Sequence, residues 1–162
     1  MFPIFMPING SITPVNDLEI CTEGYIVPAP QTEPVDGTPT PAEALAGATR
    51  WMPHWKNLDP FAGGSMHVEY DPNGGIPFPP LLVTWNAVND NGATTTSTFQ
   101  VAFFTNGDVE YRYDAMSGNG GGGAPVIVGF TNGQNALDPG NADLETELPF
   151  NTEANDSNPL TT

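Results

Sequence analysis

The side chains best suited to catalysis are few and lie far apart in the sequence. A nucleophile with a general base would need Cys21, or a serine, beside His54 or His67, because the chain holds one cysteine and two histidines. Neither histidine falls in a recognisable catalytic or zinc-binding motif. His54 stands next to Trp55, where an imidazole can simply pack, and His67 alternates outward on a predicted strand. The sequence therefore predicts no catalytic residues, and we expect a protein that is not an enzyme.

Carboxylate pairs are the other route to hydrolysis, since glycosidases place two of them across the scissile bond. Glu69, Asp108, Glu110 and Asp114 offer such pairs, but any acidic protein does, and no spacing singles one out. Glu110 shares a strand face with Arg112, so we expect a solvated polar face on which Arg112 pairs with a neighbour across the sheet. None of these carboxylates is predicted to be catalytic.

Calcium is the cofactor whose chemistry the loops match best, although no cofactor is required by the sequence. Hard cations bind carboxylates, amide oxygens and backbone carbonyls on flexible loops. Three loops rich in Asn and Asp have this composition, and none follows the EF-hand ligand order: residues 71–75, 86–91 and 138–145. Such loops are more often plain turns, because Asn and Asp hydrogen-bond to their own backbone. The candidate calcium ligands are Asp138, Asn141 and Asp143.

Aromatic side chains are the remaining candidates for ligand contact. Trp85, Phe99 and Phe103 occupy inward-alternating positions, so we assign them to the core, where aromatic residues bury the most area. Trp51 and Trp55 lie in a segment bounded by proline that does not have a clear strand pattern. These two tryptophans are therefore the predicted exposed pair and the candidate platform for a ligand such as a sugar ring.

The charge of the chain excludes one class of partner. Nineteen acidic residues face three basic ones, which gives a formal net charge of −16. Such a surface repels phosphate backbones and anionic lipids, because it has almost no cations with which to displace counterions. The sequence predicts no nucleic-acid binding, while the acidic surplus would attract Ca²⁺ or cationic partners.

The elements that must position these side chains are short strands. Apolar residues recur with a period of two in three segments, and the clearest is residues 98–113, where Asn106 and Gly107 supply the tight turn of a hairpin. Residues 125–130 form a fully apolar run, which predicts a central strand.

A short helix is predicted from a start signal formed by Thr40, Pro41 and Glu43 and a stop signal at Gly47. Cys21 is expected to be a small buried residue. The pattern favours an all-β fold, an antiparallel β-sandwich with at most one short helix.

The boundaries follow from length and composition. We expect residues 1–150 to form a single sandwich module and residues 151–162 to be a disordered acidic tail or linker, because the latter have too few apolar side chains to offset ordering entropy. The apolar start of the chain is too short and too rich in proline to span a membrane, so no membrane insertion is predicted.

Ordered sequence blocks resemble the nidogen-like extracellular module of bacterial surface and secreted proteins. The blocks occur in the order of that family and are residues 2–5 (FPIF), 18–26 (LEICTEGYI), 55–60 (WKNLDP) with Gly63 and Gly64, 83–88 (VTWNAV), 98–101 (TFQV), 106–113 (NGDVEYRY), 128–130 (VGF) and 138–144 (DPGNADL). The chain departs from the family where an acidic pair often follows an aromatic residue and a tryptophan. Lys56 and Asn57 stand there instead, which argues against an ion-binding role at that position.

The resemblance implies a non-catalytic extracellular interaction or structural module, of the adhesion or matrix type, within a larger surface or secreted protein. Its partners would be other extracellular proteins or glycans, and self-association is a further expectation. The implied location is extracellular or at the cell surface, with a signal peptide outside this chain. The alternative function is that of a lectin-like, carbohydrate-binding β-sandwich.

Overall fold

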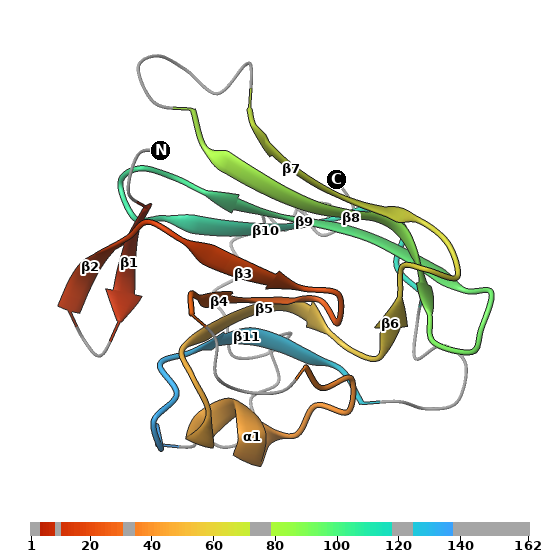
Figure 1. Cartoon of the computed structure of the whole chain (residues 1–162), viewed down its shortest axis with the longest axis horizontal. Coiled ribbons are helices and arrows are strands. Elements are labelled where there is room, and N and C mark those ends of the chain that lie inside the picture. Colours follow the sequence, from red (N-terminus) through yellow and green to blue (C-terminus); the bar gives the residue numbers. More distant parts are fainter. Residues whose placement is uncertain (1–3, 9–10, 31–34, 72–78, 118–124, 138–162) are drawn as a thin grey trace, which may run out of the picture.

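The computed structural model describes residues 4–8, 11–30, 35–71, 79–117 and 125–137 (Figure 1). The elements, in chain order, are β1 (Ile4–Ile8), β2 (Ser11–Val15), β3 (Leu18–Cys21), β4 (Tyr25–Pro28), α1 (Pro41–Ala46), β5 (Arg50–Trp55), β6 (Leu58–Asp59), β7 (Ser65–Tyr70), β8 (Leu81–Asp90), β9 (Thr96–Phe103), β10 (Val109–Tyr113) and β11 (Ile127–Thr131). The predicted tail, residues 151–162, lies outside the described residues.

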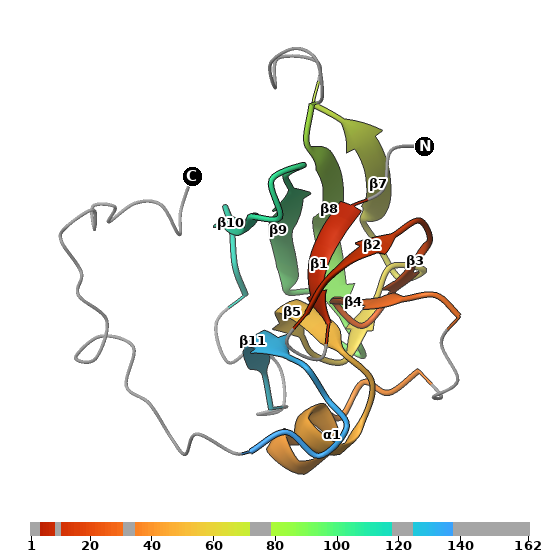
Figure 2. The same ribbon diagram turned by 90° about the vertical axis from the view of Figure 1, so that its left-hand side faces the viewer.

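Two antiparallel sheets pack face to face, and a separate hairpin of β1 and β2 lies beside them (Figures 1 and 2). The first sheet has the strand order β10-β9-β8-β6, and β7 also pairs with β8. The second has the order β11-β5-β4-β3. The fold class predicted from the sequence, an antiparallel β-sandwich with one short helix among the described residues, is confirmed.

The predicted hairpin is formed by β9 and β10, with Phe103 opposite Val109 and Phe99 opposite Tyr113. Gly107 has φ 95°, which is the conformation that glycine adopts at low cost in a tight turn. Its amide donates to the carbonyl of Phe104 at 3.0 Å. The turn chemistry read from the sequence thus fixes the register of these strands.

The space between the sheets is filled by the aromatic side chains expected there. Trp85 stacks on Phe99 with ring centroids 4.8 Å apart, and both are almost fully buried. From the second sheet, Trp51 meets Phe103 edge to face at 5.8 Å. Aromatic pairs in these two geometries contribute about 0.5–1.5 kcal/mol beyond their buried area. The assignment of Trp85, Phe99 and Phe103 to the core is confirmed.

The other face of the second sheet is also covered, by helix α1 and the loop before it. Thr40 caps the helix, because its hydroxyl accepts the amide proton of Glu43 at 3.2 Å and its own proton goes to the Glu43 carboxylate at 2.8 Å. Ala44 packs from the helix into a second apolar cluster that also holds Cys21, Tyr25, Val27, Met52 and Trp55. Cys21 is a small buried residue, as expected.

Strand β11 is an edge strand, and the prediction of a central strand for this apolar run is wrong. It pairs with β5 on one side and ends the strand order of its sheet. Val128 and Phe130 keep 48% and 41% of their surface exposed. A continuous apolar run normally marks burial on both faces, but here it leaves two large apolar side chains in contact with solvent.

Gly24 closes the turn between β3 and β4 at a point where no side chain fits. Its φ is +77°, and a Cβ built there would overlap the backbone carbonyl of His54. Gly92 has a similar φ of +74° with no atom within 4 Å of its Cβ position. We therefore expect Gly24→Ala to lower the free energy of unfolding by about 1–3 kcal/mol more than Gly92→Ala, since only the first adds a clash to the shared backbone strain. Urea denaturation of both variants measures this difference, and equal losses would contradict the account of the turn.

Candidate functional site

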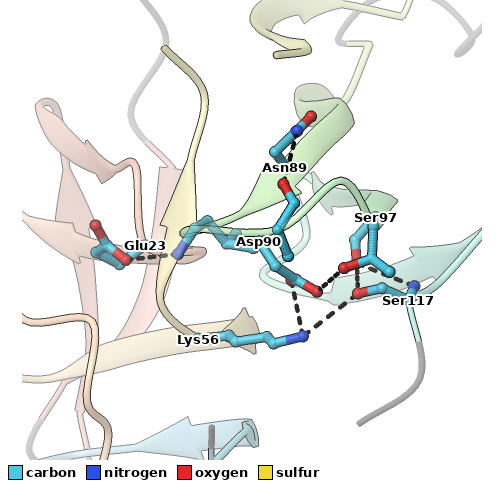
Figure 3. A network of polar contacts seen from close by, with 9 residues as sticks. Glu23, Lys56, Asn89, Asp90, Ser97 and Ser117 are labelled. Carbon is cyan, nitrogen blue, oxygen red and sulfur yellow. Dashed lines mark hydrogen bonds and ion pairs between the residues drawn. The ribbon is translucent and has the colours of Figure 1, made fainter. Parts of the chain in front are cut away.

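A buried polar cluster joins the two sheets where β5 and β8 end (Figure 3). Lys56 follows β5, and its ammonium lies 2.7 Å from the carboxylate of Asp90, the last residue of β8. The two side chains are 1% and 3% exposed. Around them, the Lys56 ammonium donates to the Ser117 hydroxyl at 3.3 Å, that hydroxyl lies 2.8 Å from the Ser97 hydroxyl, and Thr95 donates to Asp90 at 2.7 Å. A buried ion pair of this kind holds its two strands in one relative position.

The contacts of Asp90 favour its charged form. Burial alone raises the pKa of this carboxyl, but hydrogen bonds from Lys56, Thr95 and Ser117, with the charge of Lys56, outweigh it and leave the pKa below its usual range. Although Lys56 contacts a serine hydroxyl, an ammonium engaged with Asp90 has no electron pair free to activate that serine. The arrangement favours a structural role for the cluster.

The residues considered for nucleophilic catalysis are buried separately. Burial raises the pKa of Cys21, which disfavours the thiolate that would be needed. His54 is 6% exposed and packs on the Phe99 ring at 5.2 Å. Burial, and then the nearby charge of Lys56, lower the pKa of His54 to about 4, and Asp90 opposes this only in part. Its Nε2 atom has no hydrogen-bond partner among the described residues.

One serine–histidine contact was missed in the sequence. The Ser65 hydroxyl lies 2.8 Å from Nε2 of His67, two residues along β7. Both side chains lie on the outward face of an edge strand, and His67 is exposed as predicted from its alternation. A spacing of two on a strand was the available signal, since it places side chains on one face. Exposure to bulk water gives the pair neither the low dielectric nor the enclosed substrate position that hydrolases use.

A groove opens where the edges of the two sheets meet. Strands β10 and β11 end their respective sheets on the same side of the sandwich (Figure 2). The groove between them, called the β10–β11 groove below, has a volume of about 370 Å³ and is lined by Trp51, Gly107, Asp108, Val109, Tyr111, Gly129 and Phe130. This volume lies at the small end of the range for ligand pockets, which suits a single side chain or a single ring.

The walls of the groove are aromatic and are held rigidly. The Tyr111 hydroxyl donates to the carbonyl of Gly129 at 2.7 Å, which ties β10 to β11 across the gap. Burial is the largest cause of a strongly raised pKa for Tyr111, so the phenol stays protonated as this donor. Phe130 leans on Trp51 with ring centroids 5.4 Å apart. Trp51 itself is 2% exposed, so the exposed aromatic wall is Phe130.

The charged group of the groove is Asp108, which follows the β9–β10 turn. Its carboxylate accepts a hydrogen bond from the Asn106 amide at 2.6 Å, and its backbone amide donates to the Asn106 side-chain oxygen at 3.1 Å. These bonds orient the carboxylate within the turn, and Asp108 is exposed as well as lining the groove. The groove thus combines aromatic faces, one carboxylate and backbone groups of two edge strands.

Trp51 and Trp55, the expected platform, are not an exposed pair. They lie in strand β5, all six residues of which are buried, and they are 2% and 0% exposed. The register between β11 and β5 shifts, with Gly129 opposite Met52 but Ile127 opposite Trp55. This bulge inserts one residue into β5, so Trp51 enters the core between the sheets while Trp55 packs under α1. The prediction of their exposure is therefore wrong, although Trp51 does line the groove.

The candidate calcium ligands Asp138, Asn141 and Asp143 lie outside the described residues. Within the described part of the chain, no group of three or more His, Cys, Asp or Glu side chains is placed to hold a metal ion. Calcium binding stays a prediction.

A family model described as NIDO related matches residues 2–161, nearly the whole chain. The chain belongs to the NIDO-related family. No curated protein and no solved structure matches it. The resemblance to nidogen-like modules drawn from the ordered sequence blocks is thus confirmed at the level of the family.

Membership in the NIDO-related family fits an extracellular interaction module in general. Among the described residues of this NIDO-related chain, no helix has the length and apolar character needed to cross a bilayer. Lys56 stands at a position where the chain departs from the nidogen-like pattern, and its side chain forms the buried ion pair. The sequence showed this departure but not the ion-pair partner of Lys56, because Asp90 lies 34 residues away in the sequence (90 − 56).

Proposed function

We propose that this NIDO-related chain is a non-catalytic extracellular interaction module, part of a larger surface or secreted protein, that recognises its partner at the β10–β11 groove. The observation that carries the proposal is the exposed Phe130, which lines one groove together with Tyr111 and Asp108 where two sheet edges meet. Recognition sites combine apolar and aromatic surface with a few fixed polar groups, and this groove has both. Adhesion or matrix assembly is the role we expect for such contacts.

The position of the groove supports recognition of a protein segment. Edge strands present backbone groups that can pair with an incoming strand, and β10 and β11 are both edges, with the Gly129 carbonyl already accepting the Tyr111 hydroxyl. An extended segment laid along either strand would place one side chain in the groove. The buried Lys56–Asp90 cluster, by contrast, offers no surface to a partner.

The lectin-like alternative loses its original support, because Trp51 and Trp55 are buried and point to opposite faces of β5. A sugar ring stacked on Phe130 is a different ligand, which the glycan array described next would detect.

Binding measurements with paired variants test the proposal. The full chain is applied to an array of glycans and of peptides from extracellular proteins, beside Phe130→Ala and Val128→Ala. Both residues are exposed apolar side chains of β11, but only Phe130 lines the groove. We expect Phe130→Ala to weaken binding about five- to tenfold, since loss of a central aromatic contact costs more than 1 kcal/mol, and Val128→Ala to leave it unchanged. Equal effects of the two variants would contradict a site at the groove.

A further inference from the structure

The charge of the protein surface indicates which charge a ligand of the groove should carry. The chain has three lysine and arginine residues in total, and each of them contacts other side chains of the fold, two in its interior and one at its surface. Lys56 is paired with Asp90, and Arg50 is 4% exposed with its guanidinium over the rings of Tyr25 and Trp55 at 5.2 and 4.6 Å. Arg112 contacts Glu110 and Gln100, each at 2.9 Å. The surface is therefore acidic with almost no compensating cation.

The groove has an acidic residue in the same lining as aromatic residues. Asp108 is the acidic residue in its lining, and that lining has no basic residue. Aromatic faces attract cations through the ring quadrupole, and a carboxylate at the rim adds a hydrogen-bonding counter-charge. The fold already uses the same chemistry internally, where Arg50 lies over Tyr25 and Trp55. A neutral ligand would gain nothing from Asp108 as a charge or from the field of the whole acidic surface.

From this combination we infer that the β10–β11 groove receives a basic side chain, an arginine in the first place, from an extended basic segment of a partner protein. This inference rests on the proposed function and names its partner class. The guanidinium stacks on the exposed Phe130 ring and donates hydrogen bonds to the Asp108 carboxylate, while its methylene stem lies against Val109. The acidic surface raises the rate of encounter with such a segment and makes it depend on ionic strength.

The test uses two synthetic peptides of equal length. The first carries three arginines separated by glycine and serine, and the second carries citrulline in their place, which keeps the shape of the side chain but is neutral. Binding of each fluorescently labelled peptide to the full chain is followed by polarisation. We expect the citrulline peptide to bind at least about tenfold more weakly, because charge-assisted hydrogen bonds are roughly twice as strong as neutral ones and the cation–π attraction is lost as well.

Paired variants separate the groove from the general acidity of the chain. Asp108→Asn removes one charge at the groove, and Asp114→Asn removes one charge from an exposed residue outside its lining. We expect Asp108→Asn and Phe130→Ala each to weaken arginine-peptide binding about fivefold, and Asp114→Asn and Val128→Ala to change it less than twofold. Thermal melts of the four variants check that each is folded.

The outcomes distinguish this inference from the function on which it rests. Absence of arginine-peptide binding, equal binding of the citrulline peptide, or equal effects of Asp108→Asn and Asp114→Asn would overturn the cationic ligand. A glycan from the array that is lost in Phe130→Ala but kept in Val128→Ala would overturn it too, while supporting recognition at the groove. If the arginine and citrulline peptides bind equally and Phe130→Ala weakens the binding of no ligand, both the cationic ligand and recognition at the groove are overturned.

Discussion

Replacing Lys56 by methionine is expected to lower the free energy of unfolding by about 3–5 kcal/mol, because it leaves the buried Asp90 carboxylate without its counter-ion. Methionine keeps the unbranched stem and nearly the volume of lysine, so little of the loss comes from packing. The Asp90 side chain is 3% exposed and cannot regain solvation where it lies. Urea denaturation at pH 7 measures the effect.

Two further variants isolate the uncompensated charge as the cause. The double variant Lys56→Met, Asp90→Leu removes both charges and is expected to recover most of the stability lost in the single variant, while Ser97 and Ser117 keep their mutual contact at 2.8 Å. Arg112→Met breaks the exposed pair with Glu110, whose side chains are 31% and 53% exposed, and should cost less than about 1 kcal/mol. A Lys56→Met loss as small as that of Arg112→Met would show that the buried pair does not hold the sheets together.

Acid is expected to destabilise the protein through His54 well before the Asp90 carboxylate of the buried ion pair is titrated. The pKa of His54 is about 4 in the fold against an ordinary value of 6.5. The unfolded chain therefore takes up this proton first, so stability is fully present above about pH 6.5 and is lost as the pH falls toward 4. The shift corresponds to about 3 kcal/mol in all, of which about 2 kcal/mol is lost between pH 7 and pH 5.

Other groups near His54 set the limits of this pH window. The lowered pKa of Asp90 moves its own loss of stability to lower pH, because a depressed carboxyl must be protonated below its usual range. Glu23 acts in the opposite direction, since burial raises its pKa and protonation as the pH falls relieves that cost. The upper half of the window, from pH 7 to pH 5, is thus where His54 dominates.

Denaturation curves at pH 7 and pH 5 test this assignment. His54→Gln should remove most of the difference between the two pH values, whatever it does to stability at pH 7. His67→Gln, at an exposed position on β7, should leave the difference in place. A pH dependence that survives His54→Gln but disappears in His67→Gln would contradict the role given to the buried imidazole.

The parts of the fold that the sequence predicted are those controlled by local interactions. Alternation and the Asn106–Gly107 turn gave the β9–β10 hairpin, and the Thr40 cap gave helix α1, because turn and cap geometry depends on residues within a few positions. The pairing of Arg112 with Gln100 across the hairpin also followed from strand periodicity, and the structure confirms it.

The predictions that were wrong concern features that depend on contacts between segments far apart in the sequence. The apolar run of β11 reads as a central strand, but strand order in a sheet is fixed by which segments meet, and nothing in the run itself shows that one side stays unpaired. In β5, the bulge opposite residues 127–129 changes the face on which Trp55 lies, so a spacing of four between Trp51 and Trp55 did not place them together.

The groove was missed in the sequence for the same reason. Its lining comes from β5, from the β9–β10 turn, from β10 and from β11, which are up to 79 residues apart (130 − 51). The sequence showed Phe130 as part of an apolar strand and Asp108 as one of the carboxylates of the predicted hairpin. Their juxtaposition at two sheet edges depends on the packing of the sandwich, which sequence pattern alone does not determine.

The most direct test of recognition at the β10–β11 groove is a map of backbone amide chemical shifts as the bound ligand from the array is titrated into the full chain. The account predicts shifts centred on Gly107, Val109, Gly129 and Phe130, with little change at Val68 and Tyr70. These last two residues are also exposed and apolar, but they lie on β7, on the other side of β8 from the hairpin. Shifts centred on β7, with the groove amides unmoved, would contradict it.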